Sequence, residues 1–415
     1  MKWKIRVLSI LLIVLVLLFQ TACSKSRNTS GNTNSDGLIT TVSVTPTEAI
    51  VTETPKEQLS TSSEPQPDTS SVSDTKKEVD ILLKPFDDIR DVNDKKSTFE
   101  ESEYRAEDII TFTFNEGTVL KGNEKLQSEI MENGKNPGLG IRELHKEGLT
   151  GKGINVAIID QNLLLHHPEF GGKIAGYYDT GCEQDPNSGS MHAPAVTSIL
   201  VGNTIGVAPD AKVYFAAAPS WKGDSEYYAK GLYWIIEENK KLPEGEKIRV
   251  VSVSAAPSGE GSPFTKNGNM WDEAVLAAQE EGILVLDCRY NKPTGIIAPA
   301  YYNTENPEDV SMCKGGFPIS KYVVSPLYIG VPTSYRTVAE EYREGFPSYQ
   351  YTGQGGLSWG IPYAAGVLAL GWQVNPDLDN DQIVQILFDT RAVSNDRSNI
   401  IDPTAFIEAI KKTKK

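Results

Sequence analysis

The sequence predicts an α/β fold with a mostly parallel sheet, because strand-like and helix-like segments alternate from residue 136 onward. The strand-like segments are apolar nearly throughout, which is typical of strands that helices cover on both faces. These expected strands are Ile154–Ile159, Lys212–Ala217, Arg249–Ser254 and Ile283–Leu286. The expected helices between them are Ala193–Leu200, Ser225–Glu238 and Asn269–Glu281.

A second observation is a segment with small or apolar residues on every face, which we expect to be a central, buried helix that begins near Ser358. Glycines precede it in a tight turn, and Pro362 suits a first helical turn, where its missing N–H costs nothing. Asp379 and Gln382 form a candidate capping box for a further helix through Phe388. From this window alone, a plain N-cap serine is the simpler interpretation of Ser358.

The N-terminus has the pattern of a secretory signal. Three cations within residues 1–6 precede an apolar run over residues 7–19, which is shorter than the roughly 20 residues that span a bilayer. The following Gln20-Thr21-Ala22-Cys23 resembles a bacterial lipobox, with Gln where Leu is usual. We therefore expect residues 1–22 to be a signal peptide and Cys23 to become lipidated. The alternatives are a retained membrane helix and an unmodified Cys23 thiol.

Residues 23–78 are expected to be a lipidated N-terminus and a disordered tether, because they hold hardly any large apolar residue and cannot form a core. About 50 flexible residues give a typical reach of about 40 Å from the anchor. Loss of residues 1–22 removes three cations and changes the formal net charge from −15 to −18. Nucleic acid is not expected as a partner of so acidic a surface.

Residues 79–135 form an N-terminal extension or a pro-segment, and the sequence leaves both interpretations open. Ile109–Phe114 is its one expected strand, because apolar residues alternate there with threonines. Residues 136–415 then form the α/β domain. Two acidic pairs, Asp87-Asp88 and Glu340-Glu341, are expected to be solvated.

Three cysteines follow the signal: Cys182, Cys288 and Cys313. An odd number in an exported protein leaves at least one thiol free, and without a Cys-x-x-Cys spacing we expect neither a disulfide framework nor a zinc site. A bridge between Cys288 and Cys313 stays open. His166 and His167 are expected to lie on a surface turn and not to be metal ligands.

Three polar residues lie where predicted elements begin or end. Asp160 closes the first strand, His192 opens a helix, and Ser358 opens the central helix. A serine hydroxyl needs a base to take its proton, and an imidazole needs a carboxylate to fix its tautomer and stabilise its cation. Because the chemistry of such sheets gathers at the carboxyl ends of the strands, we expect these three side chains to form one site.

With these residues in that order, the chain resembles the subtilisin-like serine peptidases over about residues 136–410, and the order itself is one that this family uses. The motifs that carry the resemblance are Leu149-Thr150-Gly151-Lys152-Gly153, Gly206-Val207-Ala208-Pro209, the strand and turn from Gly282 to Asn291, and Gly356-Leu357-Ser358-Trp359-Gly360-Ile361-Pro362. The resemblance implies a three-layer sandwich with helices on both faces of the sheet.

The resemblance also implies residue roles. Asn291 falls where the family places its oxyanion-hole side chain, and the substrate-binding residues would be Ser254, Ala255, Ala256, Arg289 and Tyr290. Arg289 and Tyr290 are bulky where the family lines its primary specificity pocket with small residues, and Ala256 replaces a usual glycine. For Asp287, beside this turn, we expect an ion pair with Arg289 or another base.

We therefore expect a serine endopeptidase that acts on proteins or peptides through Asp160, His192, Ser358 and Asn291. It would be held by a lipid on the outer face of a bacterial cell membrane. No cofactor or catalytic metal is expected, and structural calcium sites, common in the family, cannot be assigned. The competing hypothesis is a non-catalytic lipoprotein that uses an altered subtilisin-like cleft, with Arg289, Tyr290 and Ala256, to hold peptides or a protein. The sequence leaves the oligomeric state open.

Overall fold

The computed structural model describes residues 83–92, 95–182, 187–289, 297–316 and 328–414. The expected signal peptide and tether lie outside these residues, as do Cys23, Tyr290 and Asn291. Within the described part of the chain, no helix has the length and apolar character needed to cross a membrane.

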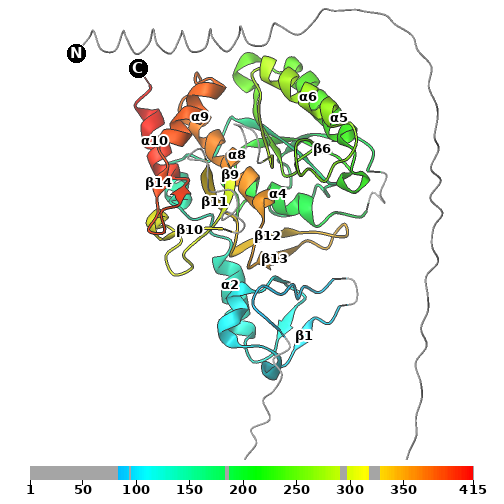
Figure 1. The fold of residues 1–415 in the computed structure, drawn as a ribbon, viewed down its shortest axis with the longest axis vertical. Coiled ribbons are helices and arrows are strands. Elements are labelled where there is room, and N and C mark those ends of the chain that lie inside the picture. Colours follow the sequence, from blue (N-terminus) through cyan, green and yellow to red (C-terminus); the bar gives the residue numbers. More distant parts are fainter. Residues whose placement is uncertain (1–82, 93–94, 183–186, 290–296, 317–327, 415) are drawn as a thin grey trace, which may run out of the picture. The chain divides into compact units, whose positions relative to one another are not determined.

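The centre of the α/β domain is a parallel five-stranded sheet in the order β5-β6-β4-β7-β8 (Figure 1). Its strands are β4 (Asn155–Asp160), β5 (Ile174–Asp179), β6 (Lys212–Ala217), β7 (Ile248–Val253) and β8 (Leu284–Asp287). Four of them confirm the predicted strands to within one residue at each end. The sequence pattern missed β5 because it is an edge strand with partly or fully exposed residues, and not an apolar run.

Helices cover both faces of this sheet. Helices α4 (His192–Val201) and α8 (Leu357–Val374) share a core with Val156 and Ile158 of β4. Helices α5 (Ser225–Lys241) and α6 (Gly268–Glu280) share the opposite core with Ala157 and Ile159 of the same strand. Successive side chains of a strand point to opposite faces, so β4 contributes to both layers. The predicted three-layer, subtilisin-like α/β fold is confirmed.

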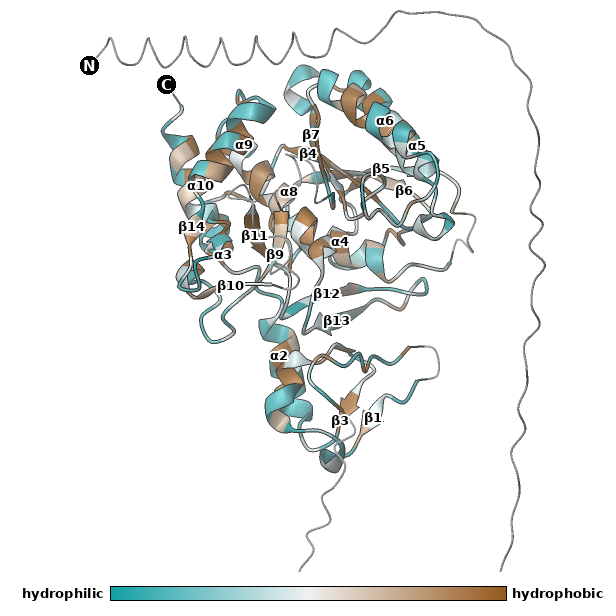
Figure 2. Cartoon of the chain, in the orientation of Figure 1, coloured by the Kyte–Doolittle hydropathy of each residue, from teal (hydrophilic) through white to brown (hydrophobic). Residues whose placement is uncertain are grey.

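Helix α8 is the most apolar helix of the domain, with all but two of its residues buried, whereas α5 carries hydrophilic residues on its outer side (Figure 2). The predicted first-turn position of Pro362 is wrong, because Pro362 lies inside the helix. Proline has no N–H to donate to the carbonyl oxygen of Ser358, four residues earlier. The hydroxyl of Ser254 donates to that oxygen at 2.7 Å instead.

A second five-stranded sheet lies in the order β10-β9-β11-β15-β14. Its strands are β9 (Ile297–Tyr301), β10 (Lys314–Gly315), β11 (Ile329–Pro332), β14 (Ala392–Val393) and β15 (Asn399–Ile400). The C-terminal helices are α9 (Asn380–Asp389) and α10 (Pro403–Lys411). Asp379 and Gln382 form the predicted capping box of α9.

The described part of the N-terminal extension, residues 83–92 and 95–135, is a small folded unit that joins the α/β domain through a sheet. Its strand β2 (Phe114–Asn115) pairs with β13 (Ser348–Thr352), which pairs in turn with β12 (Arg336–Glu340). The other elements of the extension are β1 (Thr98–Phe99), two 3-10 helices over Glu101–Glu103 and Ala106–Thr111, β3 (Val119–Leu120) and α2 (Glu124–Asn133). The short helix α3 (Ile141–Lys146) follows in the α/β domain.

The predicted strand over Ile109–Phe114 is therefore mostly wrong. A 3-10 helix reaches Thr111, whose hydroxyl donates to the carbonyl oxygen of Asp108 at 2.6 Å. Ile109, Phe112 and Phe114 are all buried, so the apparent alternation reflects packing around a turn and not the two faces of a strand.

Two expectations of surface exposure are also wrong. His167 is fully buried, with Nε2 3.1 Å from the carbonyl oxygen of Ser348 and Nδ1 accepting from the main-chain N–H of Glu169, whereas its neighbour His166 is exposed. Glu340 and Glu341 are buried as well. Glu340 accepts from Asn115, 225 residues earlier, and His167 contacts Ser348, 181 residues later, which local sequence patterns do not reveal.

Candidate active site

Asp160 is the last residue of β4, at the carboxyl edge of the central sheet, as predicted. Its side chain is buried, and its Oδ1 accepts from the main-chain N–H of Gln161 at 2.9 Å. The same oxygen lies 2.8 Å from Nδ1 of His192. An Nδ1–H that donates to a carboxylate leaves Nε2 as the acceptor of the neutral ring. The pair therefore presents the Nε2 atom of His192 as a base.

His192 is the first residue of α4, and 20% of its side chain is exposed. Burial lowers the pKa of His192, but the charge of Asp160 and the hydrogen bond between the two side chains outweigh burial, so the pKa is raised. The ring of His192 contacts the ring of Trp359 edge-on, with 5.3 Å between centroids. Because Trp359 directly follows Ser358, this contact brings the turn that carries Ser358 against the base.

Ser358 is the second residue of α8. Its hydroxyl donates to the carbonyl oxygen of Ser254 at 3.2 Å, and no hydrogen bond between described residues joins it to His192. Bonds between a nucleophile and its base are often long in ligand-free enzymes and tighten when substrate binds. Ser254 directly follows β7, the neighbour of β4, so Ser358 and Asp160 lie at the same edge of the sheet.

A pocket of about 410 Å³ opens beside Ser358. It is lined by the segment from Ser254 to Pro263, except Pro257, together with Cys288, Arg289, Leu357 and Ser358. Of the five predicted substrate-binding residues, Ser254, Ala255, Ala256 and Arg289 line this pocket, and Tyr290 lies outside the described residues.

Arg289 is buried, and its charge is paired within the protein. Its Nε lies 2.5 Å from Oδ2 of Asp287, which confirms the expected ion pair, and its guanidinium donates to Oδ1 of Asp272 on α6 at 2.8 Å. The same group reaches the hydroxyl of Ser258 at 3.3 Å. Arg289 therefore links the wall of the pocket to α6, and because its guanidinium is held by these partners, the side chain does not fill the pocket.

The cysteines of the described residues are buried free thiols, so Cys288 and Cys313 are not bridged. Burial raises the pKa of Cys182 and that of Cys313 to about 12 in each case. Among the described residues, no group of three or more His, Cys, Asp or Glu side chains could hold a metal ion. No metal ligand is therefore assigned.

Sequence reasoning missed two residues that support the site. Trp359 was noted only as part of a motif, yet its ring contacts His192. Gln161, which follows Asp160, donates through Nε2 to the hydroxyl of Ser220 at 2.7 Å. The sequence indicated these residues only through their positions directly after Ser358 and Asp160.

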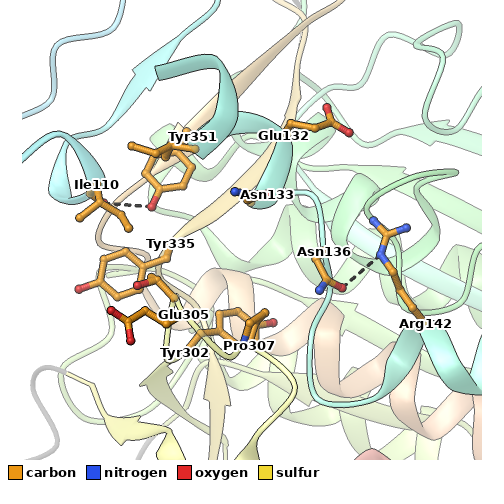
Figure 3. Close-up of a pocket in the computed structure, with 13 residues that line it drawn as sticks. Ile110, Glu132, Asn133, Asn136, Arg142, Tyr302, Glu305, Pro307, Tyr335 and Tyr351 are labelled. Carbon is orange, nitrogen blue, oxygen red and sulfur yellow. Dashed lines mark hydrogen bonds between the residues drawn. The ribbon is translucent and has the colours of Figure 1, made fainter. Parts of the chain in front are cut away.

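A second pocket, of about 590 Å³, lies between the N-terminal extension and the α/β domain (Figure 3). Ile110 of the extension faces Tyr335 and Tyr351 there, and the hydroxyl of Tyr351 donates to the carbonyl oxygen of Ile110 at 3.0 Å. Asn136 and Arg142 are hydrogen-bonded to each other at 3.1 Å. None of the predicted catalytic residues lines this pocket, so the pocket beside Ser358 is the candidate active site.

The chain is similar in sequence to a known family of α/β proteins. Residues 151–310 match the family model described as the subtilase family, Peptidase_S8. The matched residues include Asp160 and His192, whereas Ser358 lies beyond them.

The chain is similar to M-protease of Shouchella clausii (strain KSM-K16), with 27% identity over 246 residues that cover 58% of this chain and 59% of that protein. It is also similar to Subtilisin Savinase of Lederbergia lenta, with 26% identity over 246 residues that cover 58% of this chain and 83% of that protein. Among solved structures, fervidolysin from Fervidobacterium pennivorans, a keratinolytic enzyme related to subtilisin, matches with a TM-score of 0.49 and 17% identity. That match covers 67% of this chain and 47% of fervidolysin.

Proposed function

We propose that the α/β domain is a serine endopeptidase that hydrolyses peptide bonds through an acyl-enzyme. Ser358 attacks the scissile carbonyl while His192 takes the hydroxyl proton and then gives it to the leaving amine, and Asp160 orients His192 and stabilises its cation. Asn291 and the main-chain N–H of Ser358 would donate to the oxyanion. Water then attacks the ester, with His192 as base again, and releases the free serine and the carboxylic acid.

The observation that carries this proposal is the pair of the buried Asp160 and the partly buried His192 beside the N-terminus of α8. The 2.8 Å contact between Oδ1 and Nδ1 fixes the ring tautomer, and the contact between His192 and Trp359 brings the base to the residue after Ser358. Main-chain N–H groups in the first turn of a helix have no partner within the helix and favour a developing negative charge.

The pocket beside Ser358 supports a protein or peptide as the substrate. Residues 254–256 and Arg289 line it together with Ser358. Because two carboxylates already pair with Arg289, its charge does not recruit an acidic side chain. A side chain of moderate size and no negative charge suits the pocket of about 410 Å³.

The proposal includes attachment to the outer face of a bacterial membrane through a lipid on Cys23. It is supported only by the sequence pattern of residues 1–23. One acyl chain gives marginal membrane binding and two or more give a stable anchor, so a fully lipidated N-terminus should resist washing with salt. Partitioning of the protein into detergent, lost in Cys23→Ser, tests this part of the proposal.

The test of the peptidase activity is labelling with a fluorophosphonate, followed by mass mapping of the adduct. We expect one adduct, on Ser358, and neither labelling nor proteolysis in Ser358→Ala. Folded protein, checked by circular dichroism, that does not label over hours near pH 8 would favour the non-catalytic binding protein instead.

A further inference from the structure

We infer that residues 83–135 are a permanent part of the folded protein that positions the turn carrying Ser358, and not a pro-segment that is removed. The catalytic half of this inference rests on the proposed function, whereas the structural half does not. Four sets of contacts carry it.

The extension and the hairpin β12–β13 share one hydrophobic core. Tyr351 of β13 is buried in the cluster that the apolar residues of the extension form, including Ile109, Phe112 and Phe114. The rings of Phe114 and Tyr351 stack with 5.0 Å between centroids. Removal of the extension would expose this face of Tyr351 to water, which is unfavourable in proportion to the apolar area exposed.

Main-chain hydrogen bonds continue this contact along the outer edge of β13. Asn115 pairs with Gln350 and Phe114 with Tyr351, and the N–H of Gly353 donates to the carbonyl oxygen of Phe112 at 3.1 Å. An uncovered strand edge leaves a row of unpaired donors and acceptors, which makes it prone to pair with other chains. In this protein, the extension covers that edge.

A buried polar network crosses the same boundary. The Glu340 carboxylate is 1% exposed and accepts from Nδ2 of Asn115 at 2.9 Å. The guanidinium of Arg90 donates to Oε1 of Gln350 at 2.6 Å and lies 3.9 Å from Glu340. On the other side of the hairpin, the N–H of Thr337 donates to the carbonyl oxygen of Gly134 at 2.9 Å. A buried carboxylate is tolerable only with such partners, and two of them belong to the extension.

The contacts reach to within five residues of Ser358. At Gly353 the extension approaches so closely that a Cβ atom would overlap the carbonyl oxygen of Thr111. Next along the chain, Gln354 donates through Nε2 to the hydroxyl of Tyr301 at 2.8 Å, and the N–H of Gly355 donates to the hydroxyl of Ser334 at 3.1 Å. The turn that leads into α8 is thus held on one side by the extension and on the other by the α/β domain.

The test compares Arg90→Ala with Lys121→Ala in the full mature chain. Both variants remove one cation from the extension, but Lys121 pairs with Glu100 in an exposed ion pair away from the hairpin. The first measurement is hydrogen–deuterium exchange of the peptide that covers residues 353–358. We expect at least fivefold faster exchange there in Arg90→Ala, wild-type exchange in Lys121→Ala, and partial recovery in Arg90→Lys.

The second measurement is kcat and KM for a short ester substrate, about 20 °C below the melting temperature of each variant. We expect kcat to fall about tenfold in Arg90→Ala while KM stays within twofold, which a loss of stability alone would not cause in fully folded protein. The third is the mass of the native, fluorophosphonate-labelled protein, which we expect to contain residues 83–135 whether or not a peptide bond has been cut.

The outcomes separate the two proposals. Unchanged exchange in Arg90→Ala, or labelled protein that lacks residues 83–135, overturns the inference even if the wild type is an active peptidase. Wild-type protein that does not label, together with faster exchange in Arg90→Ala, refutes the peptidase function and supports the structural role of the extension.

Discussion

Replacement of Arg289 by Met is the sharpest test of how the pocket wall is held. Arg289 is 7% exposed, and the carboxylate of its partner Asp287 is 3% exposed. Removing one partner of a buried ion pair costs about 3–5 kcal/mol, because it leaves a charge in a poorly solvated place. Asp287 would keep two donors, the N–H of residue 289 at 3.1 Å and Nε1 of Trp271 at 3.2 Å. The expected loss is therefore near the lower limit, about 3 kcal/mol.

The assay is urea unfolding followed by tryptophan fluorescence. In the double variant Arg289→Met with Asp287→Asn, no buried charge is left without its partner, because the other carboxylate that pairs with Arg289, Asp272, is 42% exposed. We therefore expect a coupling of at least about 1 kcal/mol between the two sites. Lys230→Met is the matched control, because it removes a cation from an exposed pair with Glu226 and should change stability by less than about 0.5 kcal/mol. A loss below about 1 kcal/mol in Arg289→Met, or strict additivity in the double variant, would refute the reasoning.

Four further predictions follow from the site and the core. Because Asp160 raises the pKa of His192, the acidic limb of the pH profile of kcat/KM should lie above the pH at which an ordinary imidazole titrates. In Asp160→Asn only burial acts on the pKa of His192 and lowers it, so the acidic limb should move to lower pH and kcat should fall about 10⁴-fold. The raised pKa of His192 means that its interaction with Asp160 stabilises the folded protein fully at a pH below the ordinary pKa of histidine. This contribution is lost as the pH rises through the raised pKa, so the free energy of unfolding of the wild type and of Asp160→Asn should depend differently on pH between the two pKa values. Gly366→Ala should lower stability by about 1–3 kcal/mol, measured by thermal unfolding, because its Cβ would lie 2.6 Å from that of Val207, whereas Gly245→Ala, with open space around it, should be near neutral. The Cys182, Cys288 and Cys313 thiols should react with iodoacetamide only after unfolding, and modification of any of them in the folded protein would contradict their burial.

The sequence predicted those parts of the fold whose pattern is local. The strands β4, β6, β7 and β8 are apolar over most of their length. Asp160 and His192 could be placed because they stand at the ends of predicted elements. The edge strand β5 and the 3-10 helix before β2 could not be predicted, since exposed strands and tight turns lack a distinctive period. The burial of Glu340 was also beyond reach, because its partner Asn115 is 225 residues away.

The hydrogen bonding of Ser358 is a second feature that could not be predicted from the sequence. The motif around Pro362 indicated where the helix starts. It did not indicate that the proline interrupts the main-chain hydrogen bonds of α8 at the carbonyl oxygen of Ser358. The bond from Ser254 to that carbonyl depends on the neighbouring ends of β7 and α8, which only the three-dimensional fold brings together. The catalytic roles of Asp160, His192, Ser358 and Asn291 stay predictions, as does the lipidation of Cys23.

The pairing of β2 with β13 has a consequence for the order in which the chain acquires its structure. Asn115 is synthesised well before Glu340, its partner 225 residues later, and contacts of such separation slow folding because a long loop must close first. Strand β2 therefore keeps an open edge until the chain has been synthesised as far as β13. The turn that leads to Ser358 directly follows β13, so its contacts with the extension form only after this closure and not while the first half of the chain is being synthesised.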